Sequence, residues 1–275
     1  MFIKTAHNFD WDISTPQIMG ILNITPDSFF DESRQDSVED ALRKAEQLIT
    51  EGASILDIGG QSTRPQAEII HVSTELARVL PVIKAIRNAY PTQLISIDTF
   101  NSQVAAAAIE AGANIINDIS CGSFDSSMLE VAAVSNAGYI GMHITGNVET
   151  MHVIEKRNDI IQDMLAFFKL KKQQLAKAGI TNWVIDPGFG FGKSIDENFN
   201  IVKRLNELAI LELPILLGVS RKSTIYKTLG IEPAEALNGT TILNTLGMLQ
   251  GASILRVHDV KEAAEVLKIL PFIKP

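Results

Sequence analysis

Gly52–Asp57 (GASILD) has two related copies in the chain, Gly112–Asn117 (GANIIN) and Gly251–Arg256 (GASILR). Each begins with a glycine that ends a helical pattern, continues through a short loop into an apolar strand, and reaches a polar residue five positions after the glycine. Strands that are each entered from a helix are typical of βα repeats, and parallel strands bring their ends to one edge. The repeat therefore predicts a parallel α/β fold with polar groups gathered at the carboxyl ends of its strands.

The same alternation of strand and helix extends outward over the whole chain. Eight apolar runs are predicted as strands: Gln17–Leu22, Ile55–Ile58, Leu94–Ile97, Ile115–Ile116, Tyr139–His143, Trp183–Ile185, Ile215–Gly218 and Ile254–Val257. Helical patterns lie between them at 37–51, 73–89, 102–111, 127–136, about 155–178, 196–208, 222–229, 233–250 and 260–269. Pro81 lies inside one of these patterns and predicts a kink or a break there.

Strands that are apolar throughout must be covered on both faces, as in a parallel sheet. Eight βα units in a chain of 275 residues predict a TIM (β/α)8 barrel with an N-terminal β-hairpin over residues 2–16. We expect residues 1–275 to form a single domain, because no linker or low-complexity stretch divides them. A doubly wound open sheet is the alternative, but no G-x-G-x-x-G follows the first strand.

Composition excludes several classes of protein. The net charge of −8 and the lack of a Lys/Arg block argue against a nucleic acid partner. No apolar run is long enough to cross a membrane, and no signal peptide is recognisable. The single cysteine, Cys121, excludes an internal disulfide and fits a reducing compartment. We therefore expect a soluble, cytoplasmic protein without a membrane or nucleic acid partner.

The loop Asp186–Lys193 (DPGFGFGK) combines a carboxylate at a strand end with three glycines and two phenylalanines. The glycines let the backbone turn sharply and approach a ligand. Phe189 and Phe191 are apolar side chains where solvent would favour polar ones. An acid at the floor of a cavity with an aromatic lip is one interpretation. A plain glycine-rich turn with a capping aspartate is the other, and the loop alone does not decide between them.

Polar residues follow every predicted strand, and in a barrel all of them lie on one rim. They are Asn23, Asp57, Asp98, Asn117, His143, Asp186, Lys222, Arg256 and His258. Unpaired burial of so many polar groups costs roughly 1–3 kcal/mol each, so a polar planar ligand in the barrel mouth is expected to satisfy them.

The side chains on this rim suit two kinds of ligand group, a polar ring and a phosphate. Asp98, Asn117 and Asp186 can accept hydrogen bonds from a ring that bears amino and N–H groups, and Lys222 can donate to a ring carbonyl or nitrogen. Cationic or switchable donors that suit phosphate are Arg64, Arg256 and His258. Asn23 is an oxygen ligand of the kind that Mg²⁺ accepts beside pyrophosphate and water, whereas no His/Cys cluster has zinc spacing.

Several motifs, in order and spacing, resemble the dihydropteroate synthase family over essentially the whole chain. They are Met19–Phe29, Ser62–Pro65, Ile97–Thr99, Ile116–Asp118, Asp186–Lys193, Gly218–Ser223 and Arg256–Asp259. The resemblance implies a TIM barrel that joins p-aminobenzoate to 6-hydroxymethyl-7,8-dihydropterin pyrophosphate. It also implies a homodimer and a target of sulfonamides.

The resemblance further implies a role for each matching residue. The pterin site would comprise Asp98, Asn117, Met142, Asp186, Phe191, Gly218 and Lys222. Pyrophosphate and Mg²⁺ would be held by Asn23, Arg64, Arg256 and His258, with Asn23 as the metal ligand. The p-aminobenzoate site would comprise Phe29, Thr63, Pro65, Gly190, Lys222 and Ser223. Catalysis itself would depend on Asp98, Lys222, Arg256 and His258.

Some positions depart from the family pattern. Gln61 stands where glutamate is usual, Gln66 where a small residue is common, and Thr145 where glutamine is usual; residues 31–33 are less glycine-rich. The loops at 25–30 and 59–65 have the composition of mobile lids. The departures affect these loops and leave the pterin and pyrophosphate residues in place.

Other functions remain open at this point. A pterin-binding barrel that transfers a methyl group from a folate to a corrinoid would keep Asp98, Asn117 and Asp186, but it would have little use for Asn23. A non-catalytic pterin-binding barrel is a second alternative. An aldolase-like Schiff base at Lys222 is a third, if Arg221 lowers the pKa of the lysine.

Overall fold

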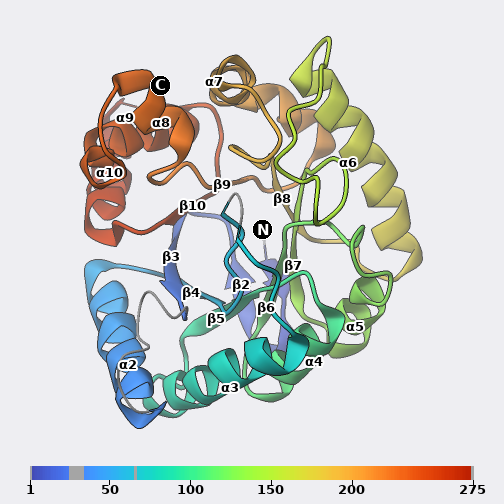
Figure 1. The fold of residues 1–275 in the computed structure, drawn as a ribbon, viewed down its shortest axis with the longest axis vertical. Coiled ribbons are helices and arrows are strands. Elements are labelled where there is room, and N and C mark those ends of the chain that lie inside the picture. Colours follow the sequence, from blue (N-terminus) through green and yellow to red (C-terminus); the bar gives the residue numbers. More distant parts are fainter. Residues whose placement is uncertain (1, 25–33, 65–66, 274–275) are drawn as a thin grey trace.

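The computed structural model describes residues 2–24, 34–64 and 67–273. In this part of the chain, eight parallel strands form a ring with helices packed outside it (Figure 1). The strands are β3 (Gln17–Asn23), β4 (Ile55–Gly59), β5 (Leu94–Asp98), β6 (Ile115–Asp118), β7 (Gly138–Met142), β8 (Val184–Asp186), β9 (Leu216–Leu217) and β10 (Ile254–Val257).

The ring is closed between its first and last strands. The hydrogen-bonded order is β8-β7-β6-β5-β4-β3-β10-β9. An isolated parallel bridge between Ile185 and Ile215 then joins β8 to the chain entering β9. An open doubly wound sheet would leave two edges here, so that alternative is wrong and the predicted barrel is confirmed.

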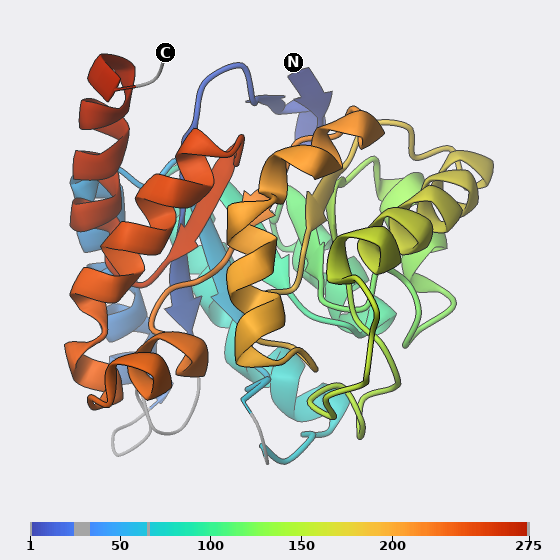
Figure 2. The same ribbon diagram turned by 90° about the horizontal axis from the view of Figure 1, so that it is seen from above.

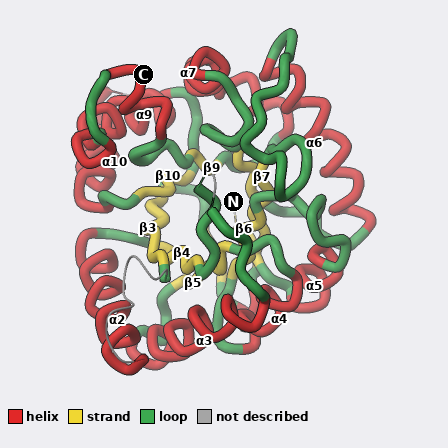
Figure 3. Tube along the Cα trace, in the orientation of Figure 1, coloured by secondary structure: helices red, strands yellow, loops and turns green. Residues whose placement is uncertain are grey.

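Helices cover the outside of the barrel in the order expected for βα units (Figure 3). They are α2 (Arg34–Glu51), α3 (Val72–Ala89), α4 (Ser102–Glu110), α5 (Met128–Ser135), α6 (Ile160–Lys177), α7 (Ile195–Lys203), α8 (Ser223–Leu229), α9 (Leu237–Leu249) and α10 (Val260–Ile273). Short 3-10 turns lie at Ala6–Asn8, Leu205–Leu211 and Pro233–Glu235. None of the described helices is long and apolar enough to span a bilayer.

Two helices differ from the sequence-based expectation. Pro81 lies within α3, which runs on as one helix from Val72 to Ala89. The helix predicted from about residue 155 begins instead at Ile160, because the Asp159 side chain caps it by accepting from the backbone N–H of Ile161. Residues 143–159 are consequently a long non-helical segment over the barrel rim.

The floor of the barrel is an apolar layer to which every strand contributes one inward side chain. These residues are Met19, Ile55, Leu94, Ile115, Ile140, Val184, Leu216 and Ile254. They pack with Ile3, Trp11 and Ile13 from the N-terminal segment. This interior is filled with side chains rather than open, as in other eight-stranded barrels.

The N-terminal hairpin closes this floor. β1 (Phe2–Lys4) pairs antiparallel with β2 (Asp10–Asp12), which confirms the predicted hairpin. The indole of Trp11 is fully buried and donates from Nε1 to Gln17 Oε1 at 2.9 Å. In Figure 2 the hairpin lies at one end of the barrel and the loops that follow the strands lie at the other. The hairpin and the apolar floor therefore cover one end of the barrel, and the polar strand ends lie at the other.

Candidate active site

The polar residues at the strand ends share the inward face with the apolar floor. Successive side chains of a strand alternate between faces, so positions two and four residues beyond the floor also point inward. The first of these steps gives Asp57, Ser96, Asn117, Met142, Asp186, Gly218 and Arg256. The second step gives Asn23, Asp98 and His258, among others. Strand periodicity thus gathers most of the predicted pterin and pyrophosphate residues in one mouth, whereas Phe191, Lys222 and Arg64 lie on the loops that follow the strands.

Arg256 is at the centre of an ion-pair network in the mouth. Its Nε donates to Asp57 Oδ2 at 2.6 Å and its Nη2 donates to Asp98 Oδ2 at 2.6 Å. Asn117 Nδ2 donates to the same Asp57 oxygen at 3.1 Å. Four strands are linked in this way. The second Asp57 oxygen, Oδ1, is buried and has no hydrogen-bond partner among the described residues.

Burial and charge act in opposite directions on these groups. Burial raises the pKa of Asp98 to about 7, and Arg256 opposes that rise. Burial also raises the pKa of Asp186, against the lowering effect of Lys222. For Arg256, burial alone would lower the pKa, but Asp57 and Asp98 outweigh it and hold the pKa above its ordinary value. The mouth therefore holds carboxyl groups that bind protons unusually tightly beside a permanent cation.

Lys222 brings a second cation to the mouth from the loop after β9. Its Nζ donates to the Phe189 carbonyl at 2.5 Å and lies 4.9 Å from the centre of the Phe191 ring. Burial lowers the pKa of Lys222 to about 8, while Asp186 opposes the change. Arg221 is not the cause, since its guanidinium pairs with Asp259 through two hydrogen bonds of 2.9 Å. Lys222 is therefore mostly charged at neutral pH, which does not favour the Schiff-base alternative.

Two glycines make room for this lysine. A Cβ on Gly190 would lie 3.0 Å from Lys222 Cδ, and Gly190 has a φ of +86°. Gly218, directly after β9, lies against both Lys222 and Arg256, with its Cβ position 3.9 Å from Lys222 Nζ. Three carboxyl groups, Asp57, Asp98 and Asp186, thus lie beside Arg256 and Lys222 in the mouth. The carboxyl oxygens favour a ligand that donates hydrogen bonds or develops positive charge.

The predicted pyrophosphate residues lie on one side of the mouth. His258 Nδ1 lies 3.0 Å from Ser220 Oγ, and Ser220 also accepts from the His258 backbone N–H at 3.1 Å. Burial lowers the pKa of His258 to about 4, and Arg256 and Arg64 lower it further through their charges. His258 is therefore neutral, and a serine that donates to Nδ1 leaves Nε2 as the N–H donor.

Asn23 lies at the end of β3, near Asp98. A Cβ on Gly59 would lie 3.5 Å from Asn23 Oδ1 and 3.6 Å from Asp98 Oδ2, so both oxygens flank the same glycine. Amide and carboxylate oxygens are ligands that Mg²⁺ accepts. Within the described residues no three His, Cys, Asp or Glu side chains form a metal cage. The donor set thus fits a Mg²⁺ ion that takes most of its ligands from phosphate and water.

An apolar wall faces the charged groups. Met142 and Phe191 belong to one cluster with Ile119, Ile144, Met151, Phe100 and Phe124. Met142 is buried, and Phe100 and Phe124 pack edge to face at 5.9 Å. A flat heterocycle between this wall and the carboxylates would contact apolar atoms on its faces and polar atoms at its edge.

The glycine-rich loop after β8 is held from beneath by Lys193. Its buried Nζ donates to the carbonyl oxygens of Gly188 at 2.8 Å, Phe191 at 3.0 Å and His143 at 3.3 Å. Burial lowers the pKa of Lys193 to about 7. The Asp186 carboxylate accepts from the Gly188 backbone N–H at 2.7 Å. Asp186 thus caps the turn as one interpretation of the sequence expected. Of the two phenylalanines expected at the lip, only Phe191 packs with Met142 at the mouth, whereas Phe189 is fully buried in the main core.

Gly188 is the position of this loop that tolerates substitution least. Its φ is +66°, and a Cβ would lie 2.2 Å from the His143 carbonyl oxygen. Gly230 has the same φ of +66° with no atom within 4 Å of its Cβ position. We expect Gly230→Ala to lower the free energy of unfolding by about 1–2 kcal/mol. Gly188→Ala should lower it by more than about 3 kcal/mol, because a backbone clash is added to the same strain. Urea unfolding measures both, and equal losses would show that the loop shifts without cost.

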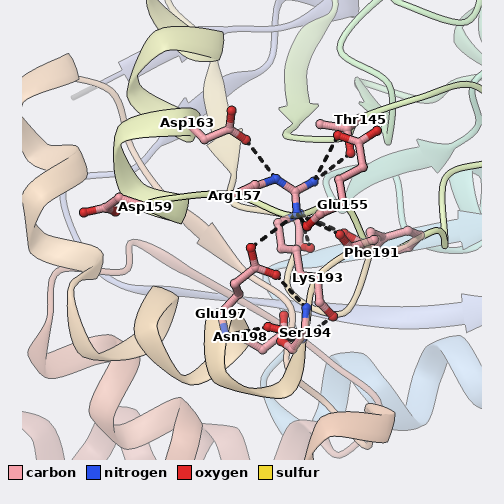
Figure 4. Close-up of polar contacts among 12 residues, drawn as sticks. Thr145, Glu155, Arg157, Asp159, Asp163, Phe191, Lys193, Ser194, Glu197 and Asn198 are labelled. Atoms are coloured by element: carbon pink, nitrogen blue, oxygen red, sulfur yellow. Dashed lines mark hydrogen bonds and ion pairs between the residues drawn. The ribbon is translucent and has the colours of Figure 1, made fainter.

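Arg157 anchors the segment 143–159 to this loop (Figure 4). Its side chain is only 6% exposed. It donates to Thr145 Oγ1 at 2.8 Å and to the Gly192 carbonyl at 3.0 Å. It also pairs with Asp163 at 3.1 Å and with Glu197 at 3.4 Å. Thr145, one of the departures from the family pattern, thus serves as an acceptor for this arginine.

Gln61 has a similar role in the loop after β4. Its Nε2 donates to the carbonyls of Ser62 at 2.7 Å and Glu68 at 2.9 Å, and its Oε1 accepts from the Ile70 backbone at 2.9 Å. A glutamate could not donate either of the first two bonds. The departure at position 61 therefore supports the loop conformation of this chain.

The structure brings most of the predicted site residues together, but two of them are not described and one strand-end residue faces away from the mouth. Thr63 is half-buried in the loop after β4, and Ser223 is half-buried at the start of α8. Phe29 and Pro65 lie outside the described residues, as do residues 25–30 and Gln66. His143 does not face the mouth, because it has the opposite strand parity. It lies between β7 and α6, where Nε2 is 3.2 Å from Asp163 Oδ2 and burial lowers its pKa to about 4.

Reasoning from sequence missed several supporting residues. Ser220 positions His258, and Lys193 and Arg157 hold the loops; Asp57 was noted at a strand end but received no role. The inward parity of Asp57 and the position of Lys193 in the DPGFGFGK loop were usable signals. Nothing in the sequence distinguishes Arg157 from its charged neighbours, because its partners come from three other segments.

Comparisons with known proteins agree with this geometry. The family model described as pterin binding enzyme matches residues 19–258. Dihydropteroate synthase of Escherichia coli K12 is 41% identical over 267 residues, which cover 96% of this chain and 94% of that protein. The Synechocystis dihydropteroate synthase is 41% identical over 264 residues, covering 95% of this chain and 91% of that protein.

Solved structures extend the likeness to three dimensions. The Yersinia pestis dihydropteroate synthase in a sulfonamide drug complex superposes with a TM-score of 0.91 at 38% identity, covering 99% of this chain and 98% of that one. The Xanthomonas albilineans enzyme with 4-aminobenzoic acid gives a TM-score of 0.90 at 34% identity, with 98% of each chain covered. The chain therefore belongs to the pterin binding enzyme family and, within it, to the dihydropteroate synthases.

Proposed function

We propose that the protein condenses 6-hydroxymethyl-7,8-dihydropterin pyrophosphate with p-aminobenzoate to give 7,8-dihydropteroate and pyrophosphate. The observation that carries this proposal is the mouth itself. It places carboxylates, an amide and an ammonium group against an apolar wall, next to a separate cationic side that suits phosphate. Full-length similarity to dihydropteroate synthases supports the same reaction.

The pterin ring would lie between the apolar wall and the carboxylates. Asp98, Asn117 and Asp186 would accept from its amino and N–H groups, and Lys222 would donate to its carbonyl or ring nitrogen. Met142, Phe191 and Gly218 would line the pocket. Asp98 and Asp186 beside the ring would also favour a ring that gains positive charge.

Bond cleavage would begin at the pterin methylene carbon. The C–O bond to pyrophosphate breaks with both electrons leaving on oxygen, which generates a cation conjugated to the pterin. Asp98 and Asp186 stabilise that cation, while Arg256, Arg64 and His258 bind the departing pyrophosphate. The aniline nitrogen of p-aminobenzoate then forms the new C–N bond and loses a proton. An aniline is nucleophilic enough to need no strong base.

The second substrate would bind on the outer side of the pterin. Thr63, Gly190, Lys222 and Ser223 would form this site together with Phe29 and Pro65. Gly190 gives the Lys222 chain room to reach the mouth. Ser223 offers a hydroxyl for the aminobenzoate carboxylate.

We also propose that Mg²⁺ acts with the pyrophosphate, held by Asn23 beside Asp98. When bound, the ion would neutralise charge that builds up on the leaving pyrophosphate. The oxygen donors of this side and the lack of a cage among the described residues support such a substrate-bridged ion. Turnover that continues unchanged in EDTA, after Mg²⁺ is removed, would contradict this assignment.

The direct test of the reaction is pyrophosphate release by the purified protein with both substrates and Mg²⁺. We expect release that depends on p-aminobenzoate and forms an equal amount of 7,8-dihydropteroate. Pterin binding without p-aminobenzoate-dependent release would support a non-catalytic barrel. Tight binding of a methylated folate but not of the pterin pyrophosphate would support the methyl-transfer alternative.

The pH dependence of kcat/KM for the pterin substrate should be bell-shaped. Asp98, with its pKa raised to about 7, becomes protonated and loses its negative charge as the pH falls through that value. Lys222, with its pKa lowered to about 8, loses its positive charge as the pH rises through that value. The maximum should lie between these values. The Asp98→Asn variant should lose the fall of kcat/KM at low pH. A fall that persists in this variant would come from titration of the substrate phosphate instead. A flat wild-type profile across this range would contradict the assignment of both groups.

We further infer that residues 1–275 form one domain that acts as a cytoplasmic homodimer. Apolar side chains exposed on α9 and α10 support a protein interface, among them Ile242, Leu246, Ile269 and Phe272. Analytical ultracentrifugation that finds only monomers at micromolar concentration would exclude the dimer.

A further inference from the structure

His152 connects two loops of the site that are far apart in sequence. Its ring stacks on Phe191, with the ring centres 5.5 Å apart and the planes 21° from parallel. Its Nε2 lies 2.9 Å from the Thr63 carbonyl oxygen. Phe191 belongs to the glycine-rich loop after β8, and Thr63 to the loop after β4. One side chain thus sets the position of both loops relative to each other.

The backbone that carries His152 is fixed on both sides. Before it, Met151 is buried in the same apolar cluster as Phe191. After it, Arg157 holds the segment to the Gly192 carbonyl. Arg157 also bonds to Thr145 earlier in the same segment, as Figure 4 shows. Gly192 has a φ of +55°, and its Cβ position is 3.0 Å from the Val153 carbonyl, so only glycine lets the two backbones approach so closely. His152 is therefore attached to a rigid segment rather than to a free loop.

Of the two contacts of His152, the Thr63 carbonyl belongs to the proposed p-aminobenzoate site, and the Phe191 ring lines the proposed pterin pocket next to Lys222. Lys222 Nζ is 4.9 Å from the same Phe191 ring, and its charge lowers the pKa of His152, after the larger effect of burial. Thr63 and Lys222 are both proposed to contact that substrate. In the described part of the chain, His152 makes no hydrogen bond to Asp186 or Asn117, which form the polar edge of the proposed pterin pocket.

We propose that His152 is a positioning residue for p-aminobenzoate: it fixes the plane of Phe191 and the Thr63 loop, and so the width of the aminobenzoate site. This inference rests on the proposed function. Loss of His152 should weaken p-aminobenzoate while leaving the pterin affected little. Loss of a ring stack or of a hydrogen bond typically weakens affinity a few-fold, so loss of both should weaken p-aminobenzoate binding roughly tenfold.

Three variants separate the two contacts. His152→Ala removes both, His152→Phe keeps the aromatic stack without the donor, and His152→Gln keeps a donor without the ring. We expect His152→Ala to raise the KM for p-aminobenzoate roughly tenfold and to leave the KM for the pterin pyrophosphate within about twofold. The His152→Phe and His152→Gln variants should each show a smaller rise in the KM for p-aminobenzoate. Ile154→Ala, at a side chain 61% exposed on the same segment, is the matched control and should keep both KM values.

Calorimetric titration of p-aminobenzoate into protein saturated with pterin and pyrophosphate measures the affinity for p-aminobenzoate without turnover. If the wild type binds p-aminobenzoate there but does not release pyrophosphate, the proposed reaction fails while the His152 comparison can still be made. Wild-type affinity for p-aminobenzoate in His152→Ala would overturn the inference. An equal loss of affinity for both substrates would also overturn it, because that pattern indicates general support of the rim.

Discussion

Replacing Arg256 by methionine should lower kcat/KM for the pterin pyrophosphate by about a thousandfold, the upper range for loss of one charge-stabilising donor group. The guanidinium pairs with Asp57 and Asp98 at 2.6 Å each, and among the described residues neither carboxylate has a second ion-pair partner. Without it, the pKa of Asp98, already raised to about 7 by burial, should rise further. The mouth would lose both a phosphate-binding cation and an ionised carboxylate.

The same change should destabilise the protein. Breaking a buried ion pair from one side typically costs about 3–5 kcal/mol, because the remaining charge is left buried without a partner. Arg256→Lys keeps the charge but cannot donate to both carboxylates in one plane, so it should be intermediate in activity. Arg204→Met is a matched control, since it removes an arginine bonded to Asp159 and Glu207 outside the mouth. Its kcat/KM should remain within about twofold of the wild type. A similar small loss in Arg256→Met would contradict a role in the mouth.

Asp186→Asn should lower the affinity for 6-hydroxymethyl-7,8-dihydropterin about a hundredfold. The carboxylate is buried, and as a charged acceptor for two ring donors it would contribute about 1.5–3 kcal/mol through each hydrogen bond. An asparagine still offers an oxygen to the Gly188 backbone N–H, so the loop should keep its conformation. The variant therefore removes charge and acceptor capacity with little change of shape. Isothermal titration calorimetry measures the effect.

Asp125→Asn provides the control for this substitution. Asp125 also accepts backbone hydrogen bonds, from Ser102 at 2.8 Å and Ser127 at 3.0 Å, but it lies at the junction of α4 and α5 rather than in the mouth. The Asp125→Asn variant should bind the pterin with an affinity within about twofold of the wild type. Asp186→Asn with wild-type pterin affinity would remove Asp186 from the pterin site.

Strand periodicity explains why so much of the site could be predicted from sequence. An inward residue such as Ile254 determines that Arg256 and His258 also face inward, whatever the loops do. The eight apolar runs predict the barrel, and a barrel brings the carboxyl ends of its strands to one rim. His143 was misplaced for the same physical reason, since it is one residue beyond the inward Met142 and so points outward to Asp163.

The supporting contacts could not be predicted in this way. The helix expected from about residue 155 starts at Ile160, where Asp159 caps it. Arg157 bonds instead to Thr145 in its own segment and to Gly192 and Glu197 in other segments. Local helical pattern carries no information about such partners. Lys193 and His152 likewise act through backbone carbonyls, which every residue has, so no residue type in the sequence marks them as contacts.

A crystal structure of the protein with 6-hydroxymethyl-7,8-dihydropterin and pyrophosphate tests most directly whether the barrel mouth is a pterin site. We expect the ring beside the apolar wall of Met142 and Phe191, within hydrogen-bond distance of Asp186 and Lys222. The pyrophosphate should lie toward Arg256 and His258. A pterin bound elsewhere on the protein, with the mouth free of ligand at saturating concentration, would contradict the proposed site.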